Sequence, residues 1–472
     1  ETEPGGGAIA GATVRFYMSV SGTPTKKGTY AIKLAGTDVS PKAQTFSTTA
    51  GTATNGSYVF SFEMPAANVN DLALTCTTVT PYDLWVNGQQ ITSDNLSVTC
   101  GDGTAVYDPV ANKLTLNNAT ITQSMYIPAT PGEINLWNDI DSGFISRMDD
   151  LNIRLVGTNT ISMDDYQSAG IDCFNSDSTS HNLAFTADKD AKLSITATAP
   201  GLEFSGYGIY TYGKVSIDGA DISINSACAG LWADSSVSIT GSNVDITIAD
   251  GSTYAGITCG SGAVTIGTST VDITLPGGTS AGDGILLSDG SKDNVLTMNT
   301  GAVVTIKGCS IGINGVLTDW QGNVQSADAT IKVNGGRLDV TTVDKTVVNT
   351  AAVTNIAEAN ITFGDGVAIE SGSWSGTAVK VVDTAKHLVV TAGAGGTATG
   401  TGWYVTGTKN IAVTATPNAG YAFNGWTENT VGIVADKTAA STTVTMPDAD
   451  ATVTANFVAK TVTRLWGNNA LD

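Results

Sequence analysis

The sequence predicts an all-β protein in which a right-handed parallel β-helix is flanked by small antiparallel β-domains. The first observation is a pattern that repeats between residues 205 and 290, where a Gly-Ile or Gly-Leu pair precedes two short alternations of apolar and polar residues. The second is the spacing of the glycines that begin each copy, which is typical of repeat architectures. These anchor glycines are Gly170, Gly208, Gly230, Gly256, Gly284 and Gly312, with steps of 38, 22, 26, 28 and 28 residues.

Each copy of the pattern supplies three short strands, as in the copy with Leu231, Val237–Ile239 and Val244–Ile248. A strand of period two sends its Val, Ile and Leu side chains to one face and its Ser, Thr, Asp and Asn side chains to the other. No single copy can bury its apolar face, whereas copies stacked in register close a continuous apolar column. Glycine suits turns with positive φ and places where backbones approach closely. The outer, polar face is then available for recognition.

The sequence divides into four segments, of which the second carries the repeat. Residues 1–80 contain alternating strands between Gly, Pro and Asn clusters, which predicts a small antiparallel β-domain. Residues 81–383 form the predicted β-helix, 384–460 a third β-unit and 461–472 a tail. Strand patterns at Ala329–Val333 and Ala359–Gly364 extend the β-helix towards its end.

Two segments of the predicted β-helix and tail resemble parts of bacterial surface proteins. Residues 82–121, with Tyr82-Asp-Leu-Trp-Val-Asn-Gly88 and Lys113-Leu-Thr-Leu-Asn117, are similar to the start of β-helical modules in large surface proteins of gut Gram-positive bacteria. The tail Val462-Thr-Arg-Leu-Trp-Gly-Asn468 resembles the first turn of a clostridial-type cell-wall-binding repeat, and an ordinary polar tail is the alternative. The first resemblance implies a surface protein, and the second a chain that continues into a wall anchor.

The third unit carries a more specific resemblance. Residues 413–426, ending Gly420-Tyr-Ala-Phe-Asn-Gly-Trp426, and residues 444–457, ending in Phe457, are similar to the divergent internalin-type B-repeat of bacterial surface proteins. We expect Tyr421, Phe423, Trp426 and Phe457 to form its small core, with Gly420 and Gly425 at turns. Residues 58–69 resemble the second half of the same pattern, which suggests that the N-terminal unit is a diverged relative.

Composition narrows the classes of partner. The chain of 472 residues has 43 acidic and 22 basic residues, and this net charge of −21 argues against a nucleic-acid partner, because a nucleic-acid-binding protein needs a basic stripe. No apolar run reaches the roughly 18 residues that span a bilayer, so we expect no membrane insertion. Glu1–Gly7 is typical of a flexible lead-in after a removed targeting segment or a trimmed boundary. We therefore expect an exported, extracellular protein at the cell surface or cell wall.

Six cysteines occur without a CxxC pair, which gives little support to a zinc site or a thioredoxin-type motif. Cys76 and Cys100 flank the start of the predicted β-helix and could form a disulfide in an oxidising compartment. Cys173 and Cys259 each lie three residues after an anchor glycine, an inward position. We expect these two to be buried free thiols.

Parallel β-helices often carry polysaccharide-cleaving sites, but the motifs of that chemistry are missing. Inverting hydrolysis needs a general acid and a general base. The sequence has Asp-Asp pairs at Asp149-Asp150 and Asp164-Asp165, yet no Gly-His-Gly and no Arg-Ile-Lys. His181 and His387 lie in unremarkable contexts and are expected to be surface or turn residues. We expect no enzyme activity, with a polysaccharide lyase or hydrolase as the least favoured alternative.

Negative charge concentrates in the first rungs of the predicted coil. Calcium takes six to eight oxygen ligands, and closely spaced carboxylates can provide several of them. None of the Asp residues follows the spacing of an EF-hand loop, and solvated turn acids are the alternative. The candidate ligands for a calcium site are Asp139, Asp141, Asp149 and Asp150, with no other cofactor expected.

One arrangement of aromatic residues favours recognition of a carbohydrate. If Ile209 and Leu231 point inward, Tyr210 and Trp232 point outward one rung apart, about 4.8 Å from each other. Tyr212 and Phe174 lie two residues further along their own rungs, on the same face. Aromatic faces of this kind suit the apolar face of a sugar ring, although a loop or a neighbouring domain could cover them.

Together these patterns predict a non-catalytic cell-surface adhesin or carbohydrate-binding protein. Its expected partner is a glycan or another component of a host or cell-wall surface, bound by a monomer. The alternative is a structural spacer that holds other modules away from the wall. The same scaffold hosts unrelated functions, so the fold cannot choose between them.

Overall fold

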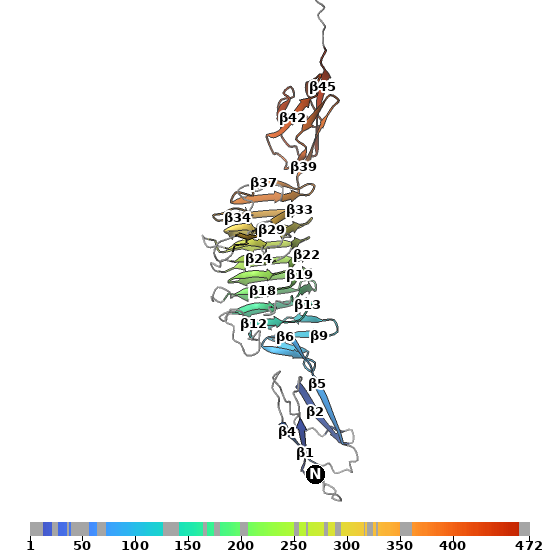
Figure 1. The fold of residues 1–472 in the computed structure, drawn as a ribbon, viewed down its shortest axis with the longest axis vertical. Coiled ribbons are helices and arrows are strands. Elements are labelled where there is room, and N and C mark those ends of the chain that lie inside the picture. Colours follow the sequence, from blue (N-terminus) through green and yellow to red (C-terminus); the bar gives the residue numbers. More distant parts are fainter. Residues whose placement is uncertain are drawn as a thin grey trace, which may run out of the picture.

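The structure is a computed structural model, and it describes residues 13–20, 27–34, 37–38, 56–63, 72–125, 141–163, 168–173, 180–198, 206–249, 254–260, 263–277, 282–287, 294–315, 317–318, 324–326, 329–349 and 361–461. All regular elements within these ranges are β-strands, numbered β1 to β45, which confirms the predicted all-β class. The strands form a long coil with a small β-unit at each of its two ends (Figure 1).

The N-terminal unit consists of two small antiparallel sheets, as predicted. One sheet pairs β1 (Thr13–Val20) with β4 (Gly56–Glu63). In the other, β2 (Lys27–Leu34) lies between β3 (Thr37–Asp38) and β5 (Leu72–Val79). Cys76 lies in β5, opposite Tyr30.

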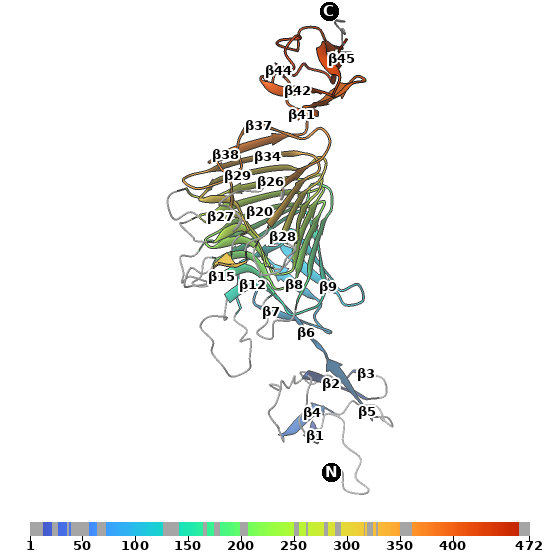
Figure 2. The ribbon, with the colours of Figure 1, turned by 45° about the horizontal axis from the view of Figure 1, so that its top comes forward.

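The coil has three walls, each a long sheet whose strands come from successive rungs (Figure 2). The first wall contains β8 (Ser97–Cys100), β9 (Gly103–Asp108), β10 (Lys113–Asn117), β13 (Leu151–Val156), β16 (Leu183–Ala187), β19 (Lys214–Asp218), β22 (Ser236–Thr240), β25 (Ala263–Ile266), β28 (Asn294–Met298), β33 (Ala329–Val333) and β36 (Ile361–Phe363). The second wall contains β11 (Thr120–Ile121), β14 (Thr158–Met163), β17 (Lys192–Ala197), β20 (Asp221–Ser226), β23 (Asn243–Ile248), β26 (Thr270–Thr274), β29 (Val303–Cys309), β34 (Arg337–Thr342), β38 (Ala378–Val382) and β37 (Ala368–Gly372). The third wall contains β7 (Gln89–Thr92), β6 (Pro81–Val86), β12 (Asp141–Ser146), β15 (Ser168–Cys173), β18 (Tyr207–Thr211), β21 (Ala229–Ala233), β24 (Ala255–Cys259), β27 (Asp283–Leu287), β30 (Ile311–Asn314) and β35 (Val348–Asn349). A separate hairpin pairs β31 (Leu317–Thr318) with β32 (Val324–Ser326).

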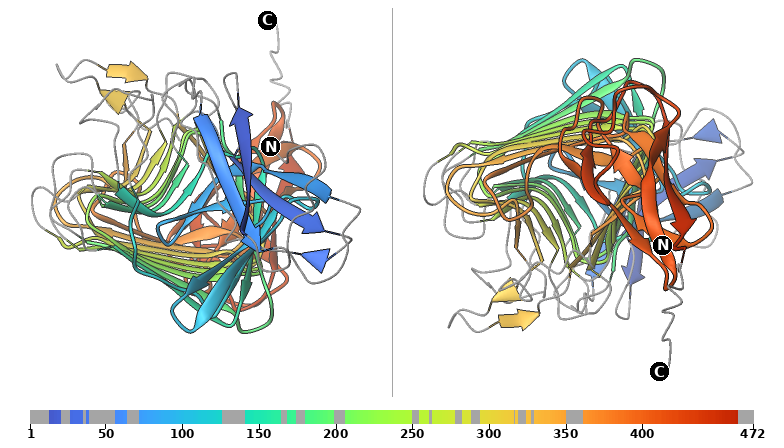
Figure 3. Two further views of the ribbon diagram at one scale, coloured as in Figure 1. Left: turned by 90° about the horizontal axis from the view of Figure 1, so that it is seen from below. Right: turned by 90° about the horizontal axis from the view of Figure 1, so that it is seen from above.

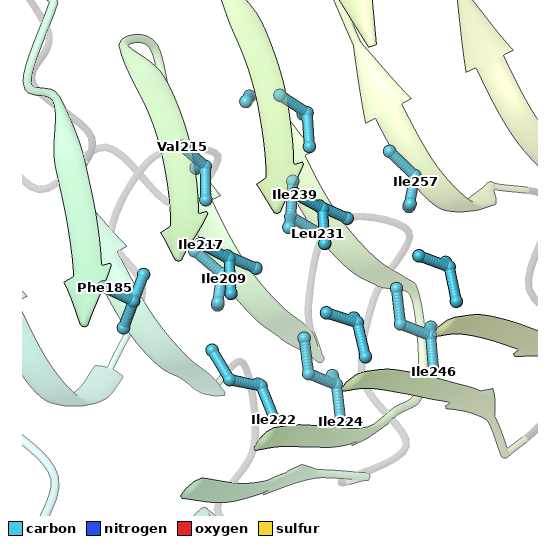
Figure 4. Packing of buried hydrophobic residues seen from close by; sticks show 14 of the residues in the cluster. Phe185, Ile209, Val215, Ile217, Ile222, Ile224, Leu231, Ile239, Ile246 and Ile257 are labelled. Carbon is cyan, nitrogen blue, oxygen red and sulfur yellow. The ribbon is translucent and has the colours of Figure 1, made fainter. Parts of the chain in front are cut away.

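Successive rungs pair in parallel and in register, so equivalent residues stack into columns. Val215 pairs with Val237, and Ile217 with Ile239, on the first wall. Ile224 pairs with Ile246 on the second wall. The apolar columns of the three walls meet inside the coil, where their side chains fill a single core (Figure 4). Seen along the coil axis, the strands of successive rungs lie over one another (Figure 3).

Antiparallel strands close both ends of the coil. At the N-terminal end β9 pairs antiparallel with both β8 and β10, and β6 pairs antiparallel with β12. At the C-terminal end β34 pairs antiparallel with β38, which in turn pairs with β37. These antiparallel strands end the repeat, as terminal units of repeat proteins do. The predicted late strands β33 and β36 are confirmed as parallel members of the first wall.

The anchor glycines lie within the strands of the third wall rather than in turns. A Cβ atom on Gly208, Gly230 or Gly256 would overlap the Cγ2 methyl of an isoleucine on the second wall. It would also lie 2.5–2.9 Å from the carbonyl oxygen of the glycine in the next rung. Close packing of two walls, rather than positive φ, therefore requires glycine at these positions.

The cysteines of the coil are buried. Cys173 and Cys259 lie in the main core, fully buried as reduced thiols, which confirms the expectation for these two residues. Cys100 is also a buried thiol of that core, and its sulfur contacts the carbonyl oxygen of Val98. The disulfide considered between Cys76 and Cys100 is therefore not formed.

The C-terminal unit has a core of its own, separate from that of the coil. Trp426 is 3% exposed within this core, and Phe423 and Phe457 pack against it. Tyr421 is outside the cluster, contrary to our expectation, because its ring lies against Gly395 at the edge of the unit. The C-terminal unit has two sheets. One contains β41 (Gly402–Tyr404), β39 (Lys386–Ala392), β45 (Ala451–Ala459) and β43 (Tyr421–Glu428). The other contains β40 (Gly396–Thr399), β42 (Ile411–Pro417) and β44 (Ser441–Val444). Gly420 has a φ of 84° in the turn before β43, as predicted, whereas Gly425, with a φ of 100°, lies inside β43 where its pairing with β45 shifts register.

Candidate binding site on the third wall

The structure places Tyr210 and Trp232 on neighbouring strands of the third wall. Tyr210 in β18 pairs with Trp232 in β21, while the preceding Ile209 and Leu231 are fully buried in the coil core. The two rings lie 5.8 Å apart with their planes at 79°, an edge-to-face contact. Both side chains are half-buried, so each ring keeps part of its surface open to solvent.

Two further tyrosines join this pair, although the sequence register did not select them. Tyr207 is 3% exposed, and its ring stacks on that of Tyr210 at 4.7 Å. Tyr254 lies 5.8 Å from Trp232 and is half-buried. Together with Tyr212 these residues form the aromatic cluster: Tyr207, Tyr210, Tyr212, Trp232 and Tyr254. The sequence signal for Tyr207 was the presence of three tyrosines in six residues, 207–212.

Tyr212 joins the aromatic cluster through Tyr210. Its ring lies 6.0 Å from that of Tyr210, whose hydroxyl donates a hydrogen bond to the Tyr212 oxygen. Burial raises the pKa of both phenols, and the negative charges of Asp172 and Asp234 raise it further. Both hydroxyls therefore stay protonated at neutral pH, and the single proton of the Tyr210 hydroxyl is engaged by Tyr212. Phe174, the fourth predicted member, lies outside the described residues.

Two carboxylates flank the aromatic cluster. Asp234 follows β21 and accepts a hydrogen bond from the indole N–H of Trp232 at 2.8 Å. Asp172 pairs in register with Tyr210 from the preceding rung and is 2% exposed. Its carboxylate lies 3.2 Å from the guanidinium of Arg147, which is also largely buried. Asp172 therefore has a cationic partner within the wall.

A buried hydroxyl lies one rung beyond Trp232. Thr258 pairs with Trp232, is 1% exposed, and its Oγ1 has no hydrogen-bond partner in the structure. A buried polar group without a partner is costly, and ordered water commonly satisfies such groups. The third wall thus combines aromatic rings, carboxylates and hydroxyls within three consecutive rungs.

The structure describes the backbone of three of the four predicted calcium ligands. Asp139 lies outside the described residues, and Asp141 is the first residue of β12. Asp149 and Asp150 are exposed in the turn before β13, where Asp150 adopts a φ of 52° and accepts a hydrogen bond from Asn182. Within the described ranges, no three His, Cys, Asp or Glu side chains come close enough together to hold a metal ion.

The two histidines lie far apart in the fold. His181 was expected at the surface or in a turn; it is 4% exposed and lies in the turn that leads into β16, with its Nδ1 3.3 Å from a carboxylate oxygen of Asp149. The Thr211 hydroxyl donates to the backbone carbonyl of His181, which fixes this turn against the next rung. His387 is in the C-terminal unit, where its ring stacks on Trp403 at 4.5 Å.

Comparison with known proteins gives a match for one part of the chain. Residues 386–461 match the Divergent InlB B-repeat domain. This range begins at the first strand of the C-terminal unit and ends just after its last strand, β45. No curated protein and no solved structure matched the chain. In the part of the chain that the structure describes, no helix is long and apolar enough to cross a membrane.

Proposed function

We propose that this chain is a non-catalytic adhesion module of the bacterial cell surface that binds a carbohydrate through the aromatic cluster of its third wall. The observation that carries this proposal is the pairing of Tyr210 with Trp232 on neighbouring strands, with part of each ring exposed. The match of residues 386–461 to a B-repeat domain supports a surface location.

The chemistry of the aromatic cluster suits a sugar. A sugar ring has an apolar C–H face, which packs on an aromatic ring, and hydroxyls around its edge, which need hydrogen-bond partners. The partly exposed rings of Tyr210 and Trp232 supply apolar surface. Asp234 is an acceptor and Tyr212 carries a hydroxyl that can donate, both of them beside those rings.

The first test is binding of the purified chain to an array of plant, host and bacterial glycans, with and without calcium. The Tyr210→Ala/Trp232→Ala double variant should lose binding. Trp403→Ala, which removes a half-buried aromatic residue of the C-terminal unit, is the matched control and should retain it. Circular dichroism should first show that each variant is folded.

Other outcomes would contradict the proposal in distinguishable ways. Binding that is lost only on chelation would move the site to the acidic residues Asp139, Asp141, Asp149 and Asp150. Release of reducing ends or unsaturated sugars from a bound glycan would show catalysis. A blank across the array would favour a structural spacer.

The spacer is the second candidate, and it is favoured by the position of the two small β-units at opposite ends of the coil (Figure 1). Deletion of residues 230–255 would remove one rung, because it joins Ala229 to the equivalent anchor Gly256. If the coil acts only as a spacer, the shortened chain should work as the full chain does. If the coil binds a glycan through the aromatic cluster, the shortened chain should lose glycan binding, because Trp232 is removed.

A further inference from the structure

We infer that the coil and the two small β-units form one stiff arm, because the joints between them are short and hydrogen-bonded. This inference is independent of the proposed function, since an adhesin and a spacer would both use such an arm. Units of one chain that share only a small interface normally move relative to each other. The stiffness must therefore come from the two joints.

The N-terminal joint consists of a single residue, Thr80, between β5 and β6. β5 ends at Val79, which is 2% exposed and pairs with Lys27 of β2. β6 begins at Pro81, which pairs with Thr92 of β7. One extended segment therefore belongs to a sheet of the N-terminal unit and, one residue later, to the third wall of the coil.

Ser93, in the segment after β7, binds both backbone groups of Thr80. The N–H of Thr80 donates to the Ser93 Oγ at 2.9 Å. The N–H of Ser93 donates to the carbonyl of Thr80, also at 2.9 Å. A residue has two soft backbone dihedral angles, and the ring of Pro81 fixes the φ that follows them. Bending at this joint would therefore break at least one of the two hydrogen bonds.

The C-terminal joint consists of residues 383–385, between β38 and β39. Ala385 is 7% exposed, and its N–H donates to the carbonyl of Gly366, in the turn before β37, at 2.9 Å. Strand β41 of the C-terminal unit lies beside β37 of the coil (Figure 2). Two residues thus separate the end of β38 from a residue that is hydrogen-bonded to the coil, which leaves little chain to bend.

An ion pair at the C-terminal joint adds little to its stiffness. Asp383 Oδ1 lies 3.3 Å from Arg337 Nε in β34, and the two side chains are 30% and 60% exposed. Exposed pairs of this kind contribute little free energy and are screened by salt. The backbone hydrogen bond of the buried Ala385 should therefore hold the joint at high salt as well as at low salt.

Residual dipolar couplings of the perdeuterated full chain measure the relative orientation of its units. Couplings from the coil and from the C-terminal unit should fit one alignment tensor, at low and at high salt alike. Insertion of Gly-Ser-Gly-Ser between Asp383 and Thr384 supplies a flexible linker. This variant should need two tensors, with couplings of the C-terminal unit reduced by at least about twofold. The same insertion between Val110 and Ala111, at the exposed tip of the β9–β10 hairpin, is the matched control and should keep one tensor.

Ser93→Ala tests the N-terminal joint. It removes the acceptor of the Thr80 N–H, so hydrogen exchange at Thr80 should become about two- to tenfold faster, the effect of losing one hydrogen bond. Couplings of the N-terminal unit should decrease relative to those of the coil. Ser236→Ala makes the same change in β22 of the first wall and should leave both measurements unchanged.

The possible outcomes separate the two joints. Different tensors for the coil and the C-terminal unit in the wild-type chain would overturn the inference. One tensor that persists in the variant with the insertion at 383–384 would overturn the role of the C-terminal joint. Loss of the common tensor at high salt would assign that role to the ion pair of Arg337 with Asp383 instead of the backbone hydrogen bond. Exchange and couplings that are unchanged in Ser93→Ala would overturn the role of Ser93 at the N-terminal joint.

Discussion

Replacement of Gly230 by alanine tests the packing of the second wall against the third. Gly230 is an anchor glycine in β21, two residues before Trp232 of the aromatic cluster. A Cβ atom there would overlap the Cγ2 methyl of Ile246 and lie 2.7 Å from the carbonyl oxygen of Gly256. Ile246 is fully buried, and Gly256 belongs to the next strand, so neither can move independently of the rung.

The expected cost follows from these contacts. An ordinary C–H···O contact has a C···O distance of about 3.3–3.6 Å, so β21 and β24 would have to separate by about 0.6 Å or more. Overpacking of this kind costs about 1–3 kcal/mol. The smaller entropy of the unfolded chain returns about 0.4–1 kcal/mol when glycine becomes alanine. We therefore expect Gly230→Ala to lower the free energy of unfolding of the coil by about 1–2 kcal/mol.

Denaturant unfolding followed by circular dichroism measures this loss, and native-state hydrogen exchange locates it in β21 and β24. Gly267→Ala is the matched control in the same coil, because the nearest atoms to its Cβ belong to the exposed side chain of Thr240, at 3.2 Å and beyond. It should change stability by less than about 0.5 kcal/mol. Removal of the overlapping methyl by Ile246→Ala should make Gly230→Ala less costly, with a coupling free energy of about 0.5–3 kcal/mol.

Two results would refute the reasoning. The first is a Gly230→Ala variant that is as stable as the wild type or more stable, since alanine would then fit without displacement. The second is strict additivity of Gly230→Ala and Ile246→Ala, which would show that the isoleucine methyl does not limit the space at residue 230.

Three further predictions concern other parts of the chain. Burial raises the pKa of Asp283 to about 6. Between about pH 4 and 6 the folded chain therefore binds more protons than the unfolded chain, so stability falls as pH rises through that window. Asp283→Asn should stabilise the chain at pH 8 by up to about 3 kcal/mol but not at pH 4, as measured by unfolding curves at both pH values. Burial also raises the pKa of Cys173 above its ordinary value and that of Cys309 to about 12, so mass spectrometry should find maleimide on both residues only after unfolding. Trp426→Ala should destabilise the C-terminal unit by about 3–5 kcal/mol, because the ring is buried and its N–H donates to the carbonyl of Ala439. Calorimetry should show that the unfolding transition of the coil is unchanged, since the two units have separate cores. A shift of the coil transition would mean that the two cores are coupled.

The fold could be predicted from sequence because one physical rule operates in every rung. Val and Ile alternate with Ser, Thr and Asp, so each strand has an apolar face, and equal spacing within a rung brings Val215 and Val237 into register. The role of the anchor glycines was harder to predict. Their sequence pattern shows where they recur, but only the structure shows that Ile246 on another wall occupies the space beside Gly230.

The aromatic site could be predicted only in part. Counting from Ile209 selects Tyr210 and Trp232, which the structure places on adjacent strands. Tyr207 precedes its anchor glycine, a position held by alanine in the next two rungs, so the repeat itself gave no reason to place an aromatic ring there. Tyr254 comes from the segment that leads into its rung, whose path the repeat does not specify. For His181 the sequence left a surface and a turn position open, and the structure places it in a turn that the hydroxyl of Thr211 holds against the next rung.

The same alternation that builds the coil also gives the candidate site its rigidity. Leu231 is fixed in the core, and the next residue, Trp232, is therefore held on the opposite face of the strand. The hydrogen bond from Trp232 to Asp234 then sets the orientation of the indole within the rung. Binding groups held in this way lose little conformational freedom when a ligand binds, which lowers the entropic cost of association. A rigid coil therefore presents Tyr210 and Trp232 to a ligand as a preformed pair, with their ring centroids held 5.8 Å apart.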